Sequence, residues 1–176
     1  MVRFADGEVS VDFKAKAFGH KHCFIIQPTC SPVNDNLMEL YLMISACKRA
    51  QAKSVTVLMP YYGYARADRK FNDTANPISA ANVAGMLEFI GVDKIFTVDL
   101  HSLQTQGFVS SKVTFDDFEG CFTGLSYFLK NIEDKDNLCI VSPDAGGMKR
   151  AMSFQKHFWW HGHSKVELAF CNKERK

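Results

Sequence analysis

The sequence alternates short apolar runs with longer segments that carry apolar residues at helical spacing. Runs of about five apolar residues are typical of strands buried in a parallel sheet, and strands alternating with helices of about ten to fifteen residues form βαβ units. We therefore predict an α/β fold with a mostly parallel sheet and helices on both faces. The expected strands are residues 8–13, 23–27, 55–59, 94–98, 137–141 and 165–171, and the expected helices are residues 37–50, 77–90, 117–131 and 148–158.

Several helix boundaries are predicted from capping residues and from charges that suit a helix terminus. The signals are Asn36 before helix 37–50, Asn76 and Pro77 at the start and Gly91 at the end of helix 77–90, and Asp116, Asp117 and Glu119 at the start of helix 117–131.

The bulk composition predicts one soluble domain. The chain has 176 residues, is 47% hydrophobic and has a formal net charge of +2, without the basic excess of a nucleic-acid binder. We find no signal peptide and no apolar run of about 18 residues, so no membrane partner and a cytoplasmic location are expected. The six cysteines lack zinc-ligand spacing and are interpreted as reduced core thiols: Cys23, Cys30, Cys47, Cys121, Cys139 and Cys171.

The segment 54–70 combines a strand with an aromatic and basic loop. Pro60 ends the strand because it has no amide hydrogen to donate to a sheet. Aromatic faces can hold a planar base, and guanidinium groups can bind phosphate oxygens, so the loop could bind a nucleotide. The alternative is a solvated basic turn whose tyrosines pack on neighbours. The residues concerned are Tyr61, Tyr62, Tyr64, Arg66, Asp68, Arg69 and Lys70.

Polar residues also follow the next expected strand. Ligands bind beyond the carboxyl ends of strands in an open parallel sheet, and this rule places Asp99 and His101 near the aromatic and basic loop. Alternate residues of an extended backbone point the same way, so this pair could hold a divalent metal ion. A hydrogen-bonded structural pair is the alternative.

Three further features lie near the end of the chain. Residues 142–147 form a glycine-rich turn before a helix, which could bind an anion, or Asp144 could simply cap the helix. The charged residues 173–176 suggest either a solvated tail or the start of a catalytic loop. A metal site is not favoured for the histidines near the tryptophans, which are His157, His161 and His163.

Seven motifs, in order and at matching spacing, resemble those of ribose-phosphate diphosphokinase, also called PRPP synthetase. They are RFADGE, FIIQ with PTCSPVNDNLMEL, MPYYGYARADRK, NPISAANVAGML, TVDLHSLQTQGF, VSPDAGGMKRA and NKERK. The resemblance implies a phosphoribosyltransferase-like domain over residues 1–176, lacking the family's first strand-helix unit and its C-terminal half. It also implies transfer of the diphosphoryl group of ATP to the C1 hydroxyl of ribose 5-phosphate, which gives PRPP and AMP.

The resemblance further implies that Mg²⁺ is the cofactor and that the protein forms a homo-oligomer built from dimers, such as a hexamer. It also implies roles for individual residues. ATP binding is implied for Phe4, Asp6 and Glu8, which would contact adenine across a dimer interface, and for Arg66, Asp68 and Arg69. The metal pair is Asp99 and His101, Asp144 would lie near the ribose phosphate, and the catalytic cations are Lys173 and Arg175.

Three positions depart from the family pattern. Ala67 stands where an amide side chain is usual, and Ser110 and Thr114 stand where many members have acidic residues. Because the C-terminal half that the resemblance implies to be absent carries the ribose phosphate loop, the isolated chain is expected to bind ATP weakly and to be inactive. One alternative is a non-catalytic, PRPP synthetase-associated regulatory subunit, and another is a phosphoribosyltransferase of the same fold.

Overall fold

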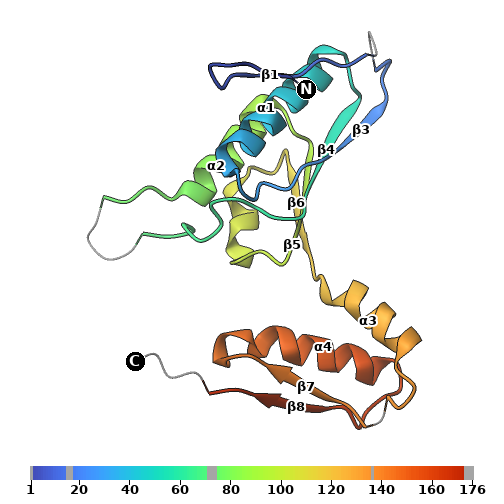
Figure 1. Ribbon diagram of the computed structural model, residues 1–176. Coiled ribbons are helices and arrows are strands. Elements are labelled where there is room, and N and C mark those ends of the chain that lie inside the picture. Colours follow the sequence, from blue (N-terminus) through green and yellow to red (C-terminus); the bar gives the residue numbers. More distant parts are fainter. Residues whose placement is uncertain (1, 15–17, 71–74, 136, 173–176) are drawn as a thin grey trace. The chain divides into compact units, whose positions relative to one another are not determined.

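The structure is a computed structural model that describes residues 2–14, 18–70, 75–135 and 137–172 (Figure 1). It divides the chain into two compact units, Met1–Phe118 and Glu119–Lys176, where the sequence led us to expect one domain. Each unit contains parallel strands and helices, so the α/β class is as predicted.

The first unit contains a parallel sheet in the order β3-β4-β5-β6. Its strands β3 (His22–Ile26), β4 (Ser54–Met59) and β5 (Lys94–Val98) lie where the apolar runs predicted them. The fourth strand, β6 (Thr114–Phe118), was not expected. The prediction that acidic residues start a helix at 117 was wrong, because Asp116 and Asp117 belong to this strand and α3 begins only at Cys121.

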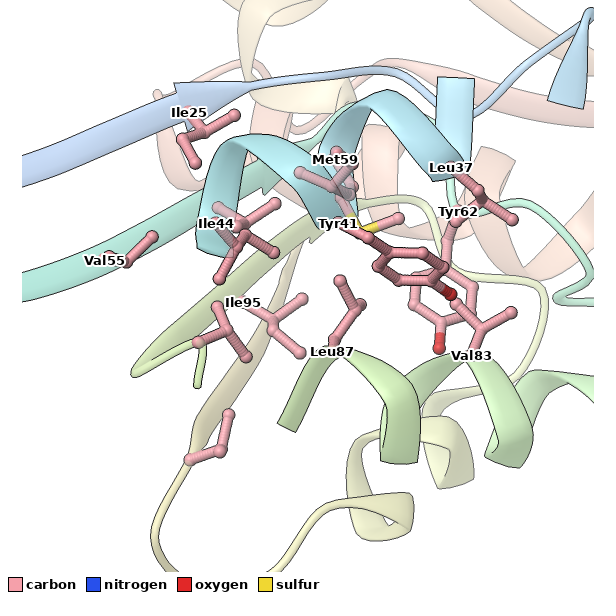
Figure 2. Packing of buried hydrophobic residues seen from close by; sticks show 14 of the residues in the cluster. Ile25, Leu37, Tyr41, Ile44, Val55, Met59, Tyr62, Val83, Leu87 and Ile95 are labelled. Carbon is pink, nitrogen blue, oxygen red and sulfur yellow. The ribbon is translucent and has the colours of Figure 1, made fainter. Parts of the chain in front are cut away.

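Helices α1 (Val33–Arg49) and α2 (Ser79–Ile90) enclose the core of the first unit. Figure 2 shows Ile44 of α1 and Leu87 of α2 pointing toward Val55 of β4 and Ile95 of β5. These four side chains belong to one cluster of buried hydrophobic residues. Strands that follow one another across a sheet through right-handed crossovers carry their connecting helices on the same face. In the described part of this unit both long helices therefore cover one face, whereas helices were predicted on both.

The helix boundaries test the predicted caps. Helix α1 begins three residues before Asn36, whose side-chain amide donates instead to the carbonyl oxygen of Cys30 at 2.9 Å. Helix α2 begins at Ser79, so Asn76 and Pro77 are not its first residues. Both of these predictions were wrong. Gly91 ends α2 with φ of 107°, which confirms the left-handed stop.

A small hairpin precedes the sheet. Strands β1 (Val2–Arg3) and β2 (Val9–Ser10) are antiparallel, and the turn between them contains Gly7 with φ of 92°. Arg3 forms an ion pair of 2.7 Å with Asp35 at the beginning of α1. The expected strand 8–13 is thus a two-residue strand within a hairpin.

The second unit contains α3 (Cys121–Asn131), β7 (Cys139–Ser142), α4 (Met148–Trp160) and β8 (Glu167–Phe170). Strands β7 and β8 are parallel, as βαβ connectivity requires, and α4 connects them. Leu125, Phe158 and Val166 form its buried cluster. The predicted last two strands and last helix are therefore present, with shifted ends.

The structure also tests the expectations for the cysteines and for membrane-spanning helices. The six cysteines, all among the described residues, form no disulfide. Their interpretation as core thiols was correct for Cys47, which is buried, and wrong for Cys30, Cys139 and Cys171, which are exposed. Across the described residues, we find no helix with the length and apolar character that crossing a membrane requires.

Candidate active site

The aromatic and basic loop and the Asp99–His101 segment begin side by side. Strands β4 and β5 are parallel neighbours, and Met59 is in register with Thr97. Because parallel strands end at the same edge of a sheet, residues 60–70 and 99–101 leave it at adjacent points. A single site that binds both a nucleotide and a metal ion would require these two segments to lie next to each other.

Thr29 follows β3, the strand next to β4, and its side chain holds the beginning of the loop in place through two hydrogen bonds. Its hydroxyl donates to the carbonyl oxygen of Tyr61 at 2.8 Å and accepts from the amide of Gly63 at 2.7 Å. A Cβ atom at position 63 would lie 2.8 Å from the carbonyl oxygen of Thr29, so only glycine fits without displacement. Thr29 is fully buried. Sequence inspection missed it because its partners are more than 30 residues away.

The tyrosines of the loop mostly support its structure. Tyr62 is buried, and its hydroxyl donates to the carbonyl oxygen of Ala80 at 2.9 Å. Burial also raises the pKa of Tyr62. The hydroxyl of Tyr64 donates to the side chain of Asn34. The packing alternative is therefore correct for Tyr62, whereas Tyr61 and Tyr64 are 47% and 43% exposed, and the ring of Tyr61 is available to a planar ligand.

The charged part of the loop faces solvent. Arg66 and Arg69 are exposed, and Asp68 is half-buried. The backbone at Ala67 is fixed at both sides, since its amide donates to Tyr64 and its carbonyl accepts from Ala80, at 3.0 and 3.1 Å. The departure from the family at position 67 therefore changes a side chain without loosening the backbone of the loop.

The Asp99–His101 pair does not lie on an extended backbone. Asp99 has φ of 51°, in the left-handed region that aspartate tolerates better than most residues. The argument from alternating strand residues was therefore wrong, although both side chains are exposed at the expected edge. A left-handed residue at a strand exit is a typical feature of functional sites.

Asp117 holds the peptide between the two residues of this pair. Its carboxylate accepts from the hydroxyl of Thr97 at 2.8 Å and from the amide of Leu100 at 3.1 and 3.2 Å. The neighbouring amide of Asp99 donates to the carbonyl oxygen of Phe118 at 3.0 Å. The unexpected strand β6 thus positions the candidate metal pair, and no local sequence signal indicated this role.

Ser110 and Thr114 stand at positions where acidic residues were expected from the family pattern. Both have structural roles in this chain. The amide of Ser110 donates to the Glu88 carboxylate at 3.0 Å, and its hydroxyl contacts the same group. These hydrogen bonds, the hydroxyl first, lower the pKa of Glu88. An acidic side chain at position 110 would repel Glu88. Thr114 begins β6 and pairs with Lys94.

The hairpin holds the three residues expected to contact adenine. The amide of Glu8 donates to the Asp6 carboxylate at 3.1 Å, and the amide of Phe4 donates to the carbonyl oxygen of Glu8 at 2.8 Å. Phe4, Asp6 and Glu8 are all exposed around this turn. Their side chains are therefore available at the surface for another molecule.

The second unit holds Asp144. Its carboxylate accepts from the amide of Gly147 at 2.9 Å, so the capping alternative describes its contact. The hydroxyl of buried Ser142 donates to the carbonyl oxygen of Asp144 at 2.7 Å. The turn opens onto a cleft of about 610 Å³ that Gly146, Gly147 and Arg150 also line. Lys173 and Arg175 lie outside the described residues.

Comparison with known proteins identifies the family. Residues 1–91 match the N-terminal domain of ribose phosphate pyrophosphokinase. The chain belongs to the ribose phosphate pyrophosphokinase family. It is 50% identical over 173 residues to ribose-phosphate pyrophosphokinase 1 of Streptococcus agalactiae, covering 98% of this chain and 51% of that protein. It is 44% identical over 175 residues to the Ralstonia nicotianae enzyme, with 98% and 51% covered.

The solved structure of phosphoribosylpyrophosphate synthetase from Mycobacterium smegmatis has a similar fold. The TM-score is 0.79 with 36% sequence identity, over 99% of this chain and 55% of that one. The predicted phosphoribosyltransferase-like fold is thus confirmed. The chain spans about half the length of the ribose phosphate pyrophosphokinases it matches.

Proposed function

We propose that this chain supplies the nucleotide-binding part of a ribose-phosphate pyrophosphokinase. In the proposed reaction the C1 hydroxyl of ribose 5-phosphate loses its proton and its oxygen attacks the β-phosphorus of ATP. The bond from the β-phosphorus to the oxygen of the α-phosphate breaks, which releases AMP and forms PRPP. The observation that carries the proposal is the adjacent exit of residues 60–70 and 99–101 from parallel neighbouring strands.

The loop would bind the phosphates of ATP. Arg66 and Arg69 are exposed and can each offer paired N–H donors to phosphate oxygens. Tyr61 offers an exposed aromatic face on the same loop. The hairpin residues Phe4 and Glu8 would contact adenine in a second copy of the chain, in a homo-oligomer built from dimers.

Asp99 and His101 are suited to a magnesium ion, since a carboxylate oxygen is a preferred ligand and water can complete the coordination. Both are exposed at the same sheet edge, and Asp117 fixes the peptide between them. When bound, the ion would neutralise charge on the transferring diphosphoryl group. Lys173 and Arg175 are proposed to add positive charge there, and Asp144 to accept from a hydroxyl of the ribose phosphate.

The test measures nucleotide binding and turnover separately. We expect weak Mg-ATP binding by calorimetry and no formation of AMP or PRPP by the isolated chain. Arg66→Ala and Arg69→Ala should each weaken binding at least tenfold. Lys53→Ala is the control, because Lys53 is an exposed cation just before β4, at the opposite edge of the sheet. Equal binding by all variants would exclude the loop as the phosphate site.

A non-catalytic regulatory subunit is the second candidate, favoured by Ala67. To distinguish the two candidates, the complete C-terminal half of a relative is fused to this chain. Two fusions are compared, one with Ala67 and one with Ala67→Gln. PRPP formation by the Ala67→Gln fusion supports the enzyme. Silence of both fusions, with folding verified by circular dichroism, supports the regulatory subunit. A cytoplasmic location stays a prediction.

A further inference from the structure

Three potential metal ligands, none of which has a role in the proposed nucleotide site, converge in the second unit. Glu119 precedes α3, Cys121 is the first residue of α3, and His157 lies in the last turn of α4. The sulfur of Cys121 lies 3.3 Å from Oε2 of Glu119, and Nε2 of His157 lies 3.6 Å from the same oxygen. The three ligand atoms all lie within 4.8 Å of one another.

These separations suit a tetrahedral zinc ion. With metal-to-ligand distances of about 2.0 to 2.3 Å, neighbouring ligand atoms in a tetrahedron are roughly 3.3 to 3.6 Å apart. The two contacts of Glu119, at 3.3 and 3.6 Å, agree with this range. The sulfur of Cys121 and the imidazole of His157 lie within 4.8 Å of each other.

The surrounding side chains hold two of the ligands in place. The imidazole of His157 is 5% exposed and contacts the rings of Phe122 and Trp160, at centroid distances of 4.2 and 4.8 Å. The hydroxyl of Ser153, one turn before His157, donates to the Glu119 carboxylate. Such contacts orient ligands in protein metal sites. Glu119 is 54% exposed, which leaves a path for an ion from solvent.

An ordinary ion pair explains the cluster less well. At 3.6 Å the His157–Glu119 contact is longer than a hydrogen bond, although the imidazole is almost completely buried. A metal ion between the Glu119 carboxylate and the His157 imidazole would be coordinated by both groups and by the adjacent thiol of Cys121.

We propose that Glu119, Cys121 and His157 bind one zinc ion. The thiolate distinguishes this cluster from the Asp99–His101 pair and favours zinc over magnesium, because soft sulfur ligands select zinc whereas magnesium is not bound by thiolates. Three protein ligands leave a fourth position for water or for a ligand from another molecule. The ion would link α3 to α4 in a unit with a small buried cluster. This site shares no residue with the proposed magnesium pair and does not depend on the proposed function.

The spacing in sequence concealed this site. Cys121 and His157 are 36 residues apart, and neither belongs to a ligand motif. The sequence interpretation set the histidines aside as exposed, which is wrong for His157, since it is buried.

The experiment titrates the reduced, chelator-treated chain with Co²⁺, a spectroscopic substitute for zinc. We expect one equivalent to bind, with visible bands of tetrahedral cobalt and a near-ultraviolet band from the thiolate. Equimolar Zn²⁺ should remove both. Cys121→Ser should abolish the near-ultraviolet band, and His157→Asn should weaken binding at least tenfold. The control is Cys139→Ser, which removes an exposed thiol of the same unit and should leave the spectrum unchanged.

A thiolate band that survives in Cys121→Ser, or that disappears in Cys139→Ser, would overturn the proposal. Glu119→Gln provides a second test if Cys121→Ser does not fold. This variant keeps the thiol, so the band should persist while cobalt binds at least tenfold more weakly. Unchanged affinity in Glu119→Gln would also contradict the site.

Discussion

The two units of the chain use the same elements but bury very different amounts of apolar surface. In the first unit, α1 and α2 pack against parallel strands over a cluster of seventeen described buried residues. In the second, the buried cluster consists of three, beneath a two-stranded sheet. A two-stranded sheet and a small core give little independent stability. The two units thus share an architecture that follows from βα connectivity, whereas the amount of buried apolar surface determines the stability of each unit.

The largest expected effect comes from removing one core side chain from each unit. Leu40→Ala should destabilise the first unit by about 2–5 kcal/mol, and Phe158→Ala should cost the second about 3–5 kcal/mol. Both side chains are almost completely buried. Because the second unit has few other buried residues, Phe158→Ala should abolish its hydrogen-exchange protection, while Leu40→Ala should only reduce that of β4. Equal residual protection in the two units would contradict the comparison.

A smaller effect is expected at the loop of the first unit. Gly63→Ala should cost roughly 1–3 kcal/mol, because the new Cβ atom meets the backbone of Thr29. The control is Gly85→Ala on the exposed face of α2, where a Cβ atom meets nothing within 4 Å. That substitution should stabilise the helix by about 0.5–1 kcal/mol. Denaturant titration of both variants gives the difference directly, and destabilisation of similar size in each would exclude the steric explanation.

One hydrogen bond in each unit sharpens the comparison further. Tyr62→Phe removes a bond of 2.9 Å to the backbone of α2, and Gln155→Ala removes a bond of 2.7 Å from α4 to Val166. Each should cost about 1 kcal/mol. Exchange rates should rise across α2 in the first case and only in β8 and α4 in the second. A Gln155→Ala effect on β4 amides would show that the units do not unfold separately.

The smallest effect concerns acid stability. The pKa of Glu88 is lowered in the folded chain, so its contribution to stability is present above its unfolded pKa and is lost as the pH falls through the folded pKa. Ser110→Ala should raise the pKa of Glu88 toward its ordinary value and reduce this loss. NMR titration of the Glu88 carboxyl carbon measures the shift. The control is Ser126→Ala in α3, whose hydroxyl donates to a backbone carbonyl, and a matching shift there would contradict the assignment.

The sequence predicted the elements that depend on local patterns. Three of the four strands of the large sheet, the helix stop at Gly91 and the adjacency of the two strand exits followed from apolar runs and from the rules of parallel sheets. Strand β6 was missed because its paired aspartates are typical of a helix start, whereas Asp117 in fact binds Thr97 and Leu100 across the sheet.

The contacts that position the candidate site could not be predicted in the same way. Thr29 and Asp117 act through partners 17 to 34 residues away, so no local pattern marks them. The left-handed backbone at Asp99 likewise depends on the end of β6, to which its amide is bonded. Such features arise from tertiary packing and become visible only when neighbouring strands are in place.

The outer face of the large sheet has a practical consequence. Phe24 and Ile26 of β3 are 67% and 68% exposed, and Phe118 of β6 is 54% exposed. Exposed aromatic and aliphatic side chains attract other apolar surfaces. Purification of the isolated chain should therefore benefit from mild detergent, and its light-scattering mass should rise with concentration. Substituting Phe24 by a lysine should suppress that rise while leaving the helices on the opposite face undisturbed.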